Sequence, residues 1–137
     1  MQPALIGEEL TRSVIGGFFE VYNTCGYGFL EAFYASALAL ELTLRGHEVR
    51  REVGIDVAYK GRVLGHQRLD MVVDGNLIVE VKATENLHRD AQRQLISYLR
   101  ATDMEVGLLL HFSPSGARFF RFVNSTNYRP SAKAGQV

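Results

Sequence analysis

Hydrophobic residues recur with helical spacing in the first third of the chain. Between residues 7 and 23 they return every three or four positions, which predicts an amphipathic helix. Gly16 and Gly17 interrupt this pattern, and we expect them where the helix packs closely against a neighbouring element. After a glycine-rich break, residues 30–46 predict a second helix that ends at Gly46.

From residue 48 the helical spacing gives way to alternation. Residues 48–83 predict three strands separated by the turns "YKGR" and "DGN", which together make an antiparallel meander. A third helix is predicted over 87–102, and two more strands over 105–112 and 117–123. The sequence therefore predicts an α/β fold in which a mixed β-sheet is flanked by helices, in the order ααβββαββ.

Composition sets the domain organisation and the compartment. With 137 residues, 47% of them hydrophobic, we expect a single domain over 1–123 and a mobile tail over 124–137, where apolar spacing is lost. The lone Cys25 rules out an internal disulfide and favours the cytoplasm. No apolar run approaches the ~18 residues of a membrane span. Because the formal net charge is 0, any nucleic-acid-binding surface has to be local.

Charged residues interrupt the apolar stretch "RLDMVVDGNLIVEVKA" at residues 68 to 83. Strand alternation places Glu80 and Lys82 on one face, and the "DGN" turn folds Asp70 back beside them. One interpretation is a solvated strand face with a weak surface ion pair, worth ~0 to 1 kcal/mol. The other is a cluster in which the two carboxylates converge.

Two converging carboxylates repel each other unless a cation lies between them. Magnesium accepts one or two carboxylates, a carbonyl and several waters, so Asp70, Glu80 and the Val81 carbonyl form an adequate site. Lys82 could then hold an attacking water or stabilise charge that develops on a phosphate. This set of residues points to metal-assisted hydrolysis of phosphodiester bonds.

The same residues resemble a known signature. Asp70, followed after a turn by Glu80, Val81 and Lys82, resembles the D…(D/E)xK motif of the PD-(D/E)XK nuclease superfamily, and the predicted element order is similar. The stretch "GFLEAFY" resembles the GxxExxY pattern of a small bacterial and archaeal family assigned to that superfamily, and the resemblance extends over 7–123. It implies a restriction-endonuclease-like fold and a Mg²⁺- or Mn²⁺-dependent nuclease that acts on nucleic acid.

The resemblance gives further residues a role, each beside an ordinary alternative. Glu31 would support the metal, or else is a first-turn glutamate stabilised by the helix dipole. Gly28 would reverse the chain before this helix, or else is a simple turn glycine. Tyr34 would either fix Glu31 or simply pack. Gln94 and Tyr98 match a QxxxY motif found beside the active site, although a surface glutamine and a half-buried tyrosine explain them equally well.

Cations and one histidine complete the set of candidates. Arg68, Arg89 and Arg93 could hold phosphates, with solvated surface charge as the alternative. His111 stands where the family usually carries asparagine, so it is either a site residue or a polar residue at the end of a strand.

Three functions remain open from the sequence. The first is the metal-dependent nuclease, favoured because every acid and lysine position of the motif is filled. The second is a catalytically inactive module that keeps the fold and binds nucleic acid or a protein. The third is a metal-free structural domain whose charged strand face is closed by another subunit. Because the chain has no separate DNA-binding domain, substrate selection would need a homodimer, a protein partner or little specificity.

Overall fold

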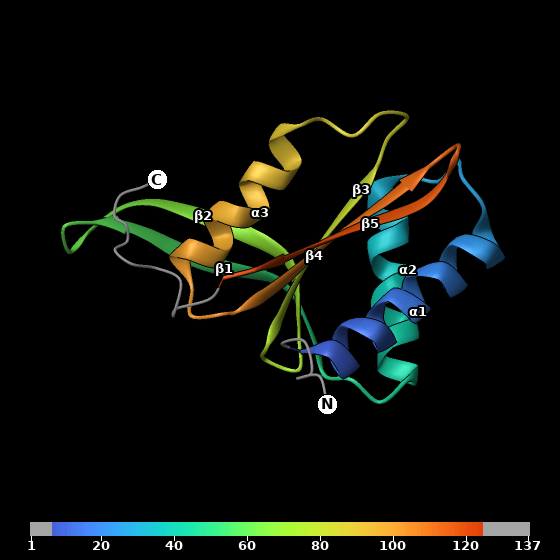
Figure 1. Ribbon diagram of the computed structural model, residues 1–137, viewed down its shortest axis with the longest axis horizontal. Helices are drawn as coiled ribbons and strands as arrows, with labels where there is room; N and C mark the ends of the chain where they lie inside the picture. The colour runs from blue at the N-terminus through green and yellow to red at the C-terminus, as the bar shows by residue number, and fades with distance from the viewer. Residues whose placement is uncertain (1–6, 125–137) are drawn as a thin grey trace, which may run out of the picture.

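The computed structural model describes residues 7–124, which form three helices and five strands (Figure 1). The helices are α1 (Glu8–Cys25), α2 (Glu31–Leu44) and α3 (Asp90–Ala101). The strands are β1 (Val49–Tyr59), β2 (Arg62–Val73), β3 (Leu77–Ala83), β4 (Val106–Ser113) and β5 (Gly116–Val123). This order confirms the predicted ααβββαββ arrangement. The tail predicted from residue 124 lies, apart from its first residue, outside the described residues.

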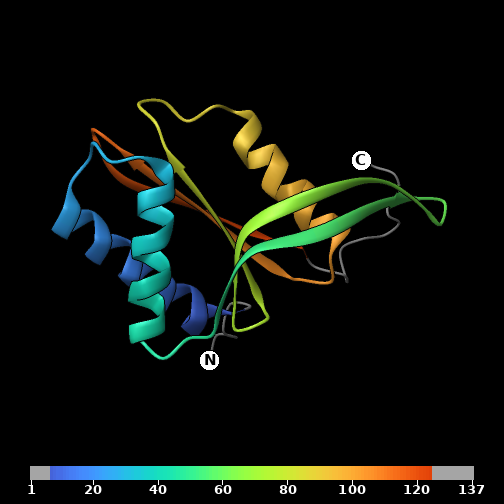
Figure 2. The ribbon, with the colours of Figure 1, turned by 180° about the vertical axis from the view of Figure 1, so that it is seen from behind.

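The strands form one mixed sheet in the order β1-β2-β3-β4-β5. β3 and β4 run parallel, and the other neighbours are antiparallel. Parallel neighbours need a long connection, and α3 provides it. Helices α1 and α2 cover one face of the sheet while α3 covers the other, as Figures 1 and 2 show. Among the described residues, no helix combines the length and apolar character needed to span a membrane.

Each face of the sheet has its own hydrophobic core. Beneath α1 and α2, Phe18, Tyr34 and Phe112 are among the fully buried residues of the first core. Leu95 of α3 belongs to the second core on the opposite face. The two-helix layer is tight, because a Cβ on Gly17 would lie 3.0 Å from Leu42 Cδ2. The glycine therefore allows the close helix contact that the sequence predicted.

The β1–β2 hairpin reaches well beyond the sheet (Figures 1 and 2). β1 and β2 pair along nearly their whole length, whereas β2 pairs with β3 only over Met71 to Val73. The hairpin thus leaves the sheet one residue before Met71, at Asp70. Its departure creates the break in the sheet around which the candidate site is built.

Candidate active site

Asp70 lies at the position where β2 stops pairing with β3 and continues to pair with β1 alone. Met71 and Leu69 should share a strand face, yet Met71 belongs to the core under α1 and α2 while Leu69 belongs to the core under α3. The hairpin therefore twists sharply at Asp70. Across the β1–β2 ladder at this point, Glu52 has a φ of 52°, in the left-handed region that non-glycine residues rarely adopt. Backbone outliers of this kind cluster at functional sites.

The carboxylates of Asp70 and Glu80 bridge the gap that opens between β2 and β3. Glu80 Oε2 accepts a hydrogen bond of 2.9 Å from the Asp70 backbone N–H. Asp70 Oδ2 accepts one of 2.7 Å from the Val81 backbone N–H. Each side chain satisfies a backbone donor just beyond the last paired residues of β2 and β3. The predicted convergence of the two acids is confirmed, and one oxygen of each is left without a hydrogen bond among the described residues.

Burial makes this pair electrostatically unfavourable when both acids are ionised. Glu80 is only 4% exposed, so the interpretation of a solvated strand face is wrong for this residue. Its pKa is raised to about 8, first by burial and then by the negative charge of Asp70. The Asp70 backbone hydrogen bond and the charge of Lys82 act in the opposite direction, while Glu31 raises the pKa further. The site therefore favours a bound cation or proton.

Lys82 and Glu31 flank the two carboxylates from different elements. Lys82 follows Glu80 by two residues on β3 and is half-buried. Glu31 begins α2, and its Oε1 accepts a hydrogen bond of 3.3 Å from the Ala83 backbone N–H. The first turn of α2 is thereby tied to the end of β3, where the charge of Glu31 raises the pKa of Glu80.

A groove separates the end of β3 from α3. It measures about 570 Å³, and Lys82, Gln94 and Arg93 are among its lining residues. Tyr98, four residues after Gln94, is buried, and its hydroxyl donates a long hydrogen bond of 3.5 Å to Gln67 Oε1. Burial raises the pKa of Tyr98, and the charges of Glu80 and Asp70 raise it further. Tyr98 therefore lies near the two carboxylates, while Gln94 lines the groove with Lys82; neither Asp70 nor Glu80 is among the residues that line this groove.

His111 is a buried part of this end of the sheet. It pairs with Lys82 across the β3–β4 ladder and is fully buried. Its Nε2 lies 2.9 Å from the Thr84 carbonyl, and because a carbonyl only accepts, Nε2 carries the proton. Burial lowers the pKa of His111, and the charge of Arg118 lowers it further. A neutral His111 thus holds the turn that follows β3.

Gly28 and Tyr34 shape the loop that leads into α2. Gly28 has a φ of 132°, which glycine tolerates better than other residues. The Tyr34 hydroxyl donates to the Gly26 carbonyl and accepts a hydrogen bond of 3.3 Å from the Phe29 N–H. Tyr34 stacks on Phe112 with ring centroids 4.1 Å apart. Of the two predicted alternatives for Tyr34, the structure shows packing, combined with fixing the loop.

The three predicted phosphate-binding arginines occupy different places. Arg93 lines the groove, 3.6 Å from Asp90 Oδ1. Arg68 lies on β2 near the site but is exposed, 3.6 Å from Glu52 Oε1. Arg89 is the exposed residue that precedes α3. The structure therefore brings one of the three into the groove beside Lys82.

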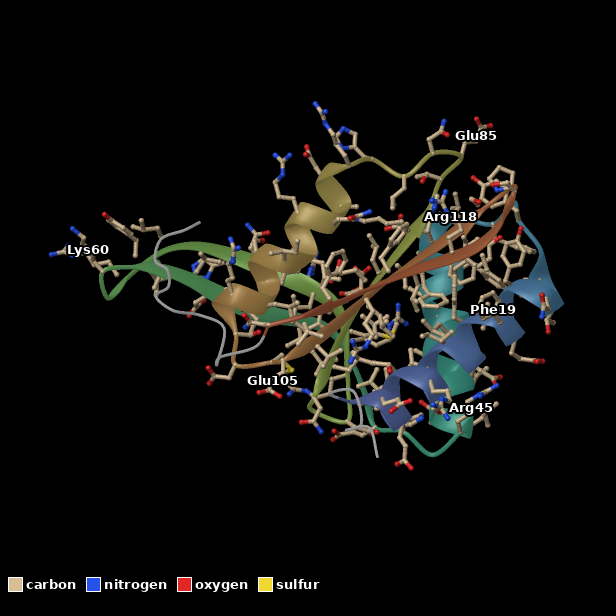
Figure 3. All side chains as sticks on the ribbon, viewed as in Figure 1. Phe19, Arg45, Lys60, Glu85, Glu105 and Arg118 are labelled. Atoms are coloured by element: carbon tan, nitrogen blue, oxygen red, sulfur yellow. The ribbon has the colours of Figure 1, made fainter. Side chains whose placement is uncertain are left out.

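Sequence reasoning missed one cation at this end. Arg118 of β5 pairs with His111, which itself pairs with Lys82, so the three side chains form a row across neighbouring strands. Figure 3 shows Arg118 and Glu85 at the same end of the molecule. Lys82 and Arg118 are far apart in sequence, and only the register of the parallel β3–β4 pair brings them into the same row.

The donor set suits a hard divalent cation. Within residues 7–124, no three acidic, histidine or cysteine side chains meet as a ready-made metal cluster. Two carboxylates, a nearby backbone carbonyl and water would satisfy Mg²⁺, which keeps several waters. The repulsion between Asp70 and Glu80 is what a divalent cation would relieve. The residues present therefore fit such an ion.

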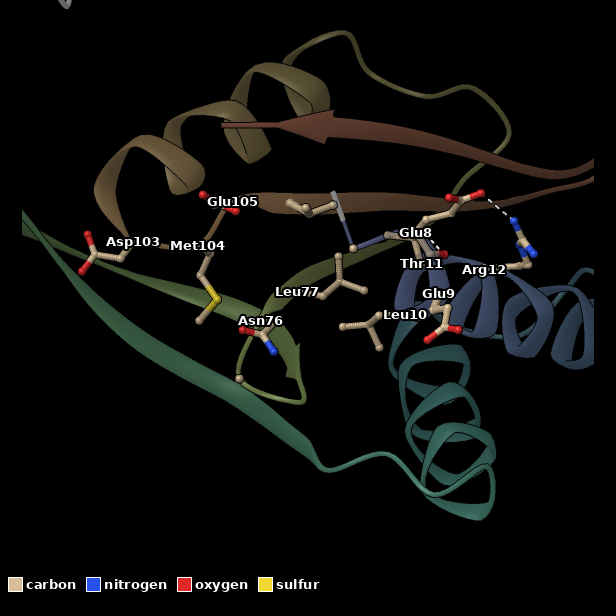
Figure 4. Close-up of a pocket in the computed structure, with 13 residues that line it drawn as sticks. Glu8, Glu9, Leu10, Thr11, Arg12, Asn76, Leu77, Asp103, Met104 and Glu105 are labelled. Atoms are coloured by element: carbon tan, nitrogen blue, oxygen red, sulfur yellow. Dashed lines mark hydrogen bonds and ion pairs between the residues drawn. The ribbon is translucent and has the colours of Figure 1, made fainter. Parts of the chain in front are cut away.

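A second hollow lies at the opposite end of β3. It measures about 1020 Å³ and is lined by residues that include Glu8, Leu77 and Met104 (Figure 4). None of the predicted site residues lines it. The candidate chemistry is therefore confined to the end of β3 where the strands separate.

Among the comparisons with known proteins, a family model identifies the superfamily. Residues 8–121 match the PD-(D/E)XK nuclease superfamily. No curated protein matches the chain. Among the solved structures that match is the crystal structure of SSO0001, with 23% sequence identity and a TM-score of 0.49 over 64% of this chain. The matched region spans 47% of that chain. The protein belongs to the PD-(D/E)XK nuclease superfamily, whose nucleases generally use divalent metals.

Proposed function

We propose that the protein is a cytoplasmic Mg²⁺- or Mn²⁺-dependent nuclease of the GxxExxY family that hydrolyses phosphodiester bonds. The observation that carries the proposal is the convergence of a buried glutamate and a half-buried aspartate from two separating strands, with a lysine next to them. Metal-dependent hydrolysis needs anionic oxygen ligands and a positive group near the phosphate. Asp70, Glu80 and Lys82 supply both within one short stretch of two strands.

Each residue has a distinct task in this proposal. Asp70, Glu80 and the Val81 carbonyl would hold the metal, whose chemistry is to polarise the phosphate and lower the pKa of a bound water. Glu31 supports the ion from the start of α2. Lys82 holds the attacking water or offsets negative charge on the phosphate. Gln94 lines the same groove and orients that water or a phosphate oxygen.

Substrate binding would rely on local cations, because the net charge of the chain is 0. Arg93 lies in the groove, Arg89 lies between two of its lining residues, and Arg68 is exposed on β2, where the last two would contact phosphates farther from the cleaved bond. The alternative is a catalytically inactive protein with this fold that binds nucleic acid or a protein partner. The acid and lysine positions are all occupied, which favours the enzyme.

The first test measures thermal unfolding during Mg²⁺ and Mn²⁺ titrations. We compare wild type with Asp70→Asn, and use Asp56→Asn as a matched control, because Asp56 is an exposed aspartate on the same hairpin, bound to His66. A ligand that binds only the native state stabilises it by about 2.7 kcal/mol at a hundredfold excess over Kd. Wild type and Asp56→Asn should gain stability, and Asp70→Asn should not.

Nuclease assays on single- and double-stranded DNA and RNA follow, with Lys82→Ala as the control for chemistry. Metal-dependent cleavage that disappears in Lys82→Ala supports the proposal. Binding of nucleic acid without cleavage in any metal would support the inactive module instead. The absence of any metal-dependent stabilisation in wild type would refute the nuclease.

A further inference from the structure

Exposed aromatic side chains cluster where the loop after α1 enters α2, around the support residue Glu31. Phe29 is 49% exposed and Phe33 is 42% exposed, and Leu30 between them is 80% exposed. The two phenylalanine rings stack with centroids 4.4 Å apart and planes 26° from parallel. We call Phe29 and Phe33 the aromatic ledge.

The ledge is firmly anchored. Both rings make edge contacts with Tyr34, at centroid distances of 6.1 Å for Phe29 and 5.9 Å for Phe33. Tyr34 is itself buried and stacked on Phe112 in the core, and its hydroxyl binds the Phe29 N–H. The contacts with Tyr34 therefore link the two exposed rings to the core of the protein and fix their orientation.

The ledge also lies next to the candidate site. Glu31, between the two phenylalanines in sequence, binds the Ala83 backbone, one residue after Lys82. Figures 1 and 2 both show the start of α2 beside the end of β3. The Lys82 side chain lines the groove beside α3, on the other face of the sheet from α2, so a strand that contacts both Lys82 and the ledge would pass around the end of β3.

We propose that the aromatic ledge stacks unpaired bases, and that the substrate of this site is single-stranded nucleic acid. This inference rests on the proposed nuclease function. Aromatic side chains stack on any base, because every base has a π-face, and cationic groups track the backbone beside them. Within a duplex the base faces are already stacked on one another, so an aromatic platform beside the cleavage site suits an unpaired strand. Arg118 and Arg93 provide cations on either side of Lys82.

The test measures binding of fluorescent 15-nucleotide oligo(dT) and oligo(rU) against a blunt 15-base-pair duplex, by anisotropy in EDTA. We compare wild type with the double variant Phe29→Leu/Phe33→Leu, which keeps apolar bulk and removes both π-faces. Tyr59→Leu is the matched control, because Tyr59 is 62% exposed at the far tip of the hairpin. Thermal unfolding of all three proteins verifies that they are folded.

We expect single strands to bind wild type at least tenfold more tightly than the duplex. Loss of stacking on one base weakens binding about 5- to 150-fold, so the ledge variant should lose at least fivefold while Tyr59→Leu stays within twofold. Equal or tighter duplex binding, or an unchanged ledge variant, would overturn the inference. Light scattering that shows a wild-type dimer and a monomeric ledge variant would also overturn it, because a second copy would then cover the ledge.

The metal titration separates this inference from the proposed function. A protein that shows Asp70-dependent metal stabilisation but no preference for single strands remains a candidate nuclease, and only the ledge inference fails. A protein whose ledge binds single strands but whose Asp70 and Glu80 bind no metal loses the nuclease proposal and keeps the ledge.

Discussion

Replacing Glu80 with glutamine should stabilise the metal-free protein at alkaline pH. In the folded protein the pKa of Glu80 is raised from 4.5 to about 8, chiefly by burial and by the charge of Asp70. The folded state therefore holds this proton more tightly than the unfolded state. The contribution of Glu80 to the free energy of unfolding is therefore fully present below pH 4.5, and this contribution is lost as the pH rises towards 8.

The magnitude follows from that difference in pKa. Each pKa unit corresponds to about 1.4 kcal/mol. Ionised Glu80 would therefore lower the free energy of unfolding by up to about 5 kcal/mol. Glutamine carries no charge at any pH, and its side-chain oxygen can still accept the hydrogen bond from the Asp70 N–H. We therefore expect Glu80→Gln to raise the free energy of unfolding by about 2 to 5 kcal/mol at pH 8.5, and by much less at pH 4.5.

Urea denaturation in EDTA at pH 4.5, 6.5 and 8.5 measures this difference. The stability advantage of Glu80→Gln over wild type should grow with pH, and the slope with urea concentration should stay constant. Glu41→Gln is the matched control, because Glu41 lies on α2, far from Asp70 in sequence, in a helical ion pair with Arg45. An advantage equal at all three pH values, or a loss of stability at pH 8.5, would refute the electrostatic reasoning.

Three further predictions address neighbouring residues. Asp70→Asn should lower the pKa of Glu80 in the folded protein, because the charge of Asp70 raises it. Glu80 would then ionise at lower pH, so in urea titrations the loss of stability with rising pH should occur at lower pH than in wild type. Lys82→Ala should keep the metal-dependent rise in Tm while cleavage falls at least a hundredfold in a nuclease assay. Tyr34→Phe should cost about 1 to 2 kcal/mol in urea denaturation and speed hydrogen exchange at Phe29, because two loop hydrogen bonds lose their partner.

The sequence predicted the element order because the change from helical to alternating spacing at residue 48 is sharp. It also predicted the convergence of Asp70 and Glu80, because the "DGN" turn fixes the pairing of β2 with β3. Both are local signals, in which neighbouring residues determine the outcome.

The parts of the site that escaped prediction depend on long-range register. Arg118 reaches the row beside Lys82 only through two ladders, one of which pairs strands joined by α3. The left-handed backbone of Glu52 likewise follows from the twist of the hairpin at Asp70. The aromatic ledge was present in the motif "GFLEAFY", but its exposure depends on how Tyr34 anchors the loop. Whether an aromatic side chain is exposed or buried at such a position cannot be predicted from a single sequence.

The break in the sheet and the candidate metal site have one physical origin. Where strands pair regularly, backbone N–H groups bond to carbonyls of a neighbouring strand and need no carboxylates. Here the hairpin twists away, so the carboxylates satisfy the backbone donors of Asp70 and Val81, and each has one oxygen without a hydrogen bond among the described residues. The side chains that bridge the two separating strands are therefore the ones available to a cation, which explains why Asp70 and Glu80 stand among valines and leucines.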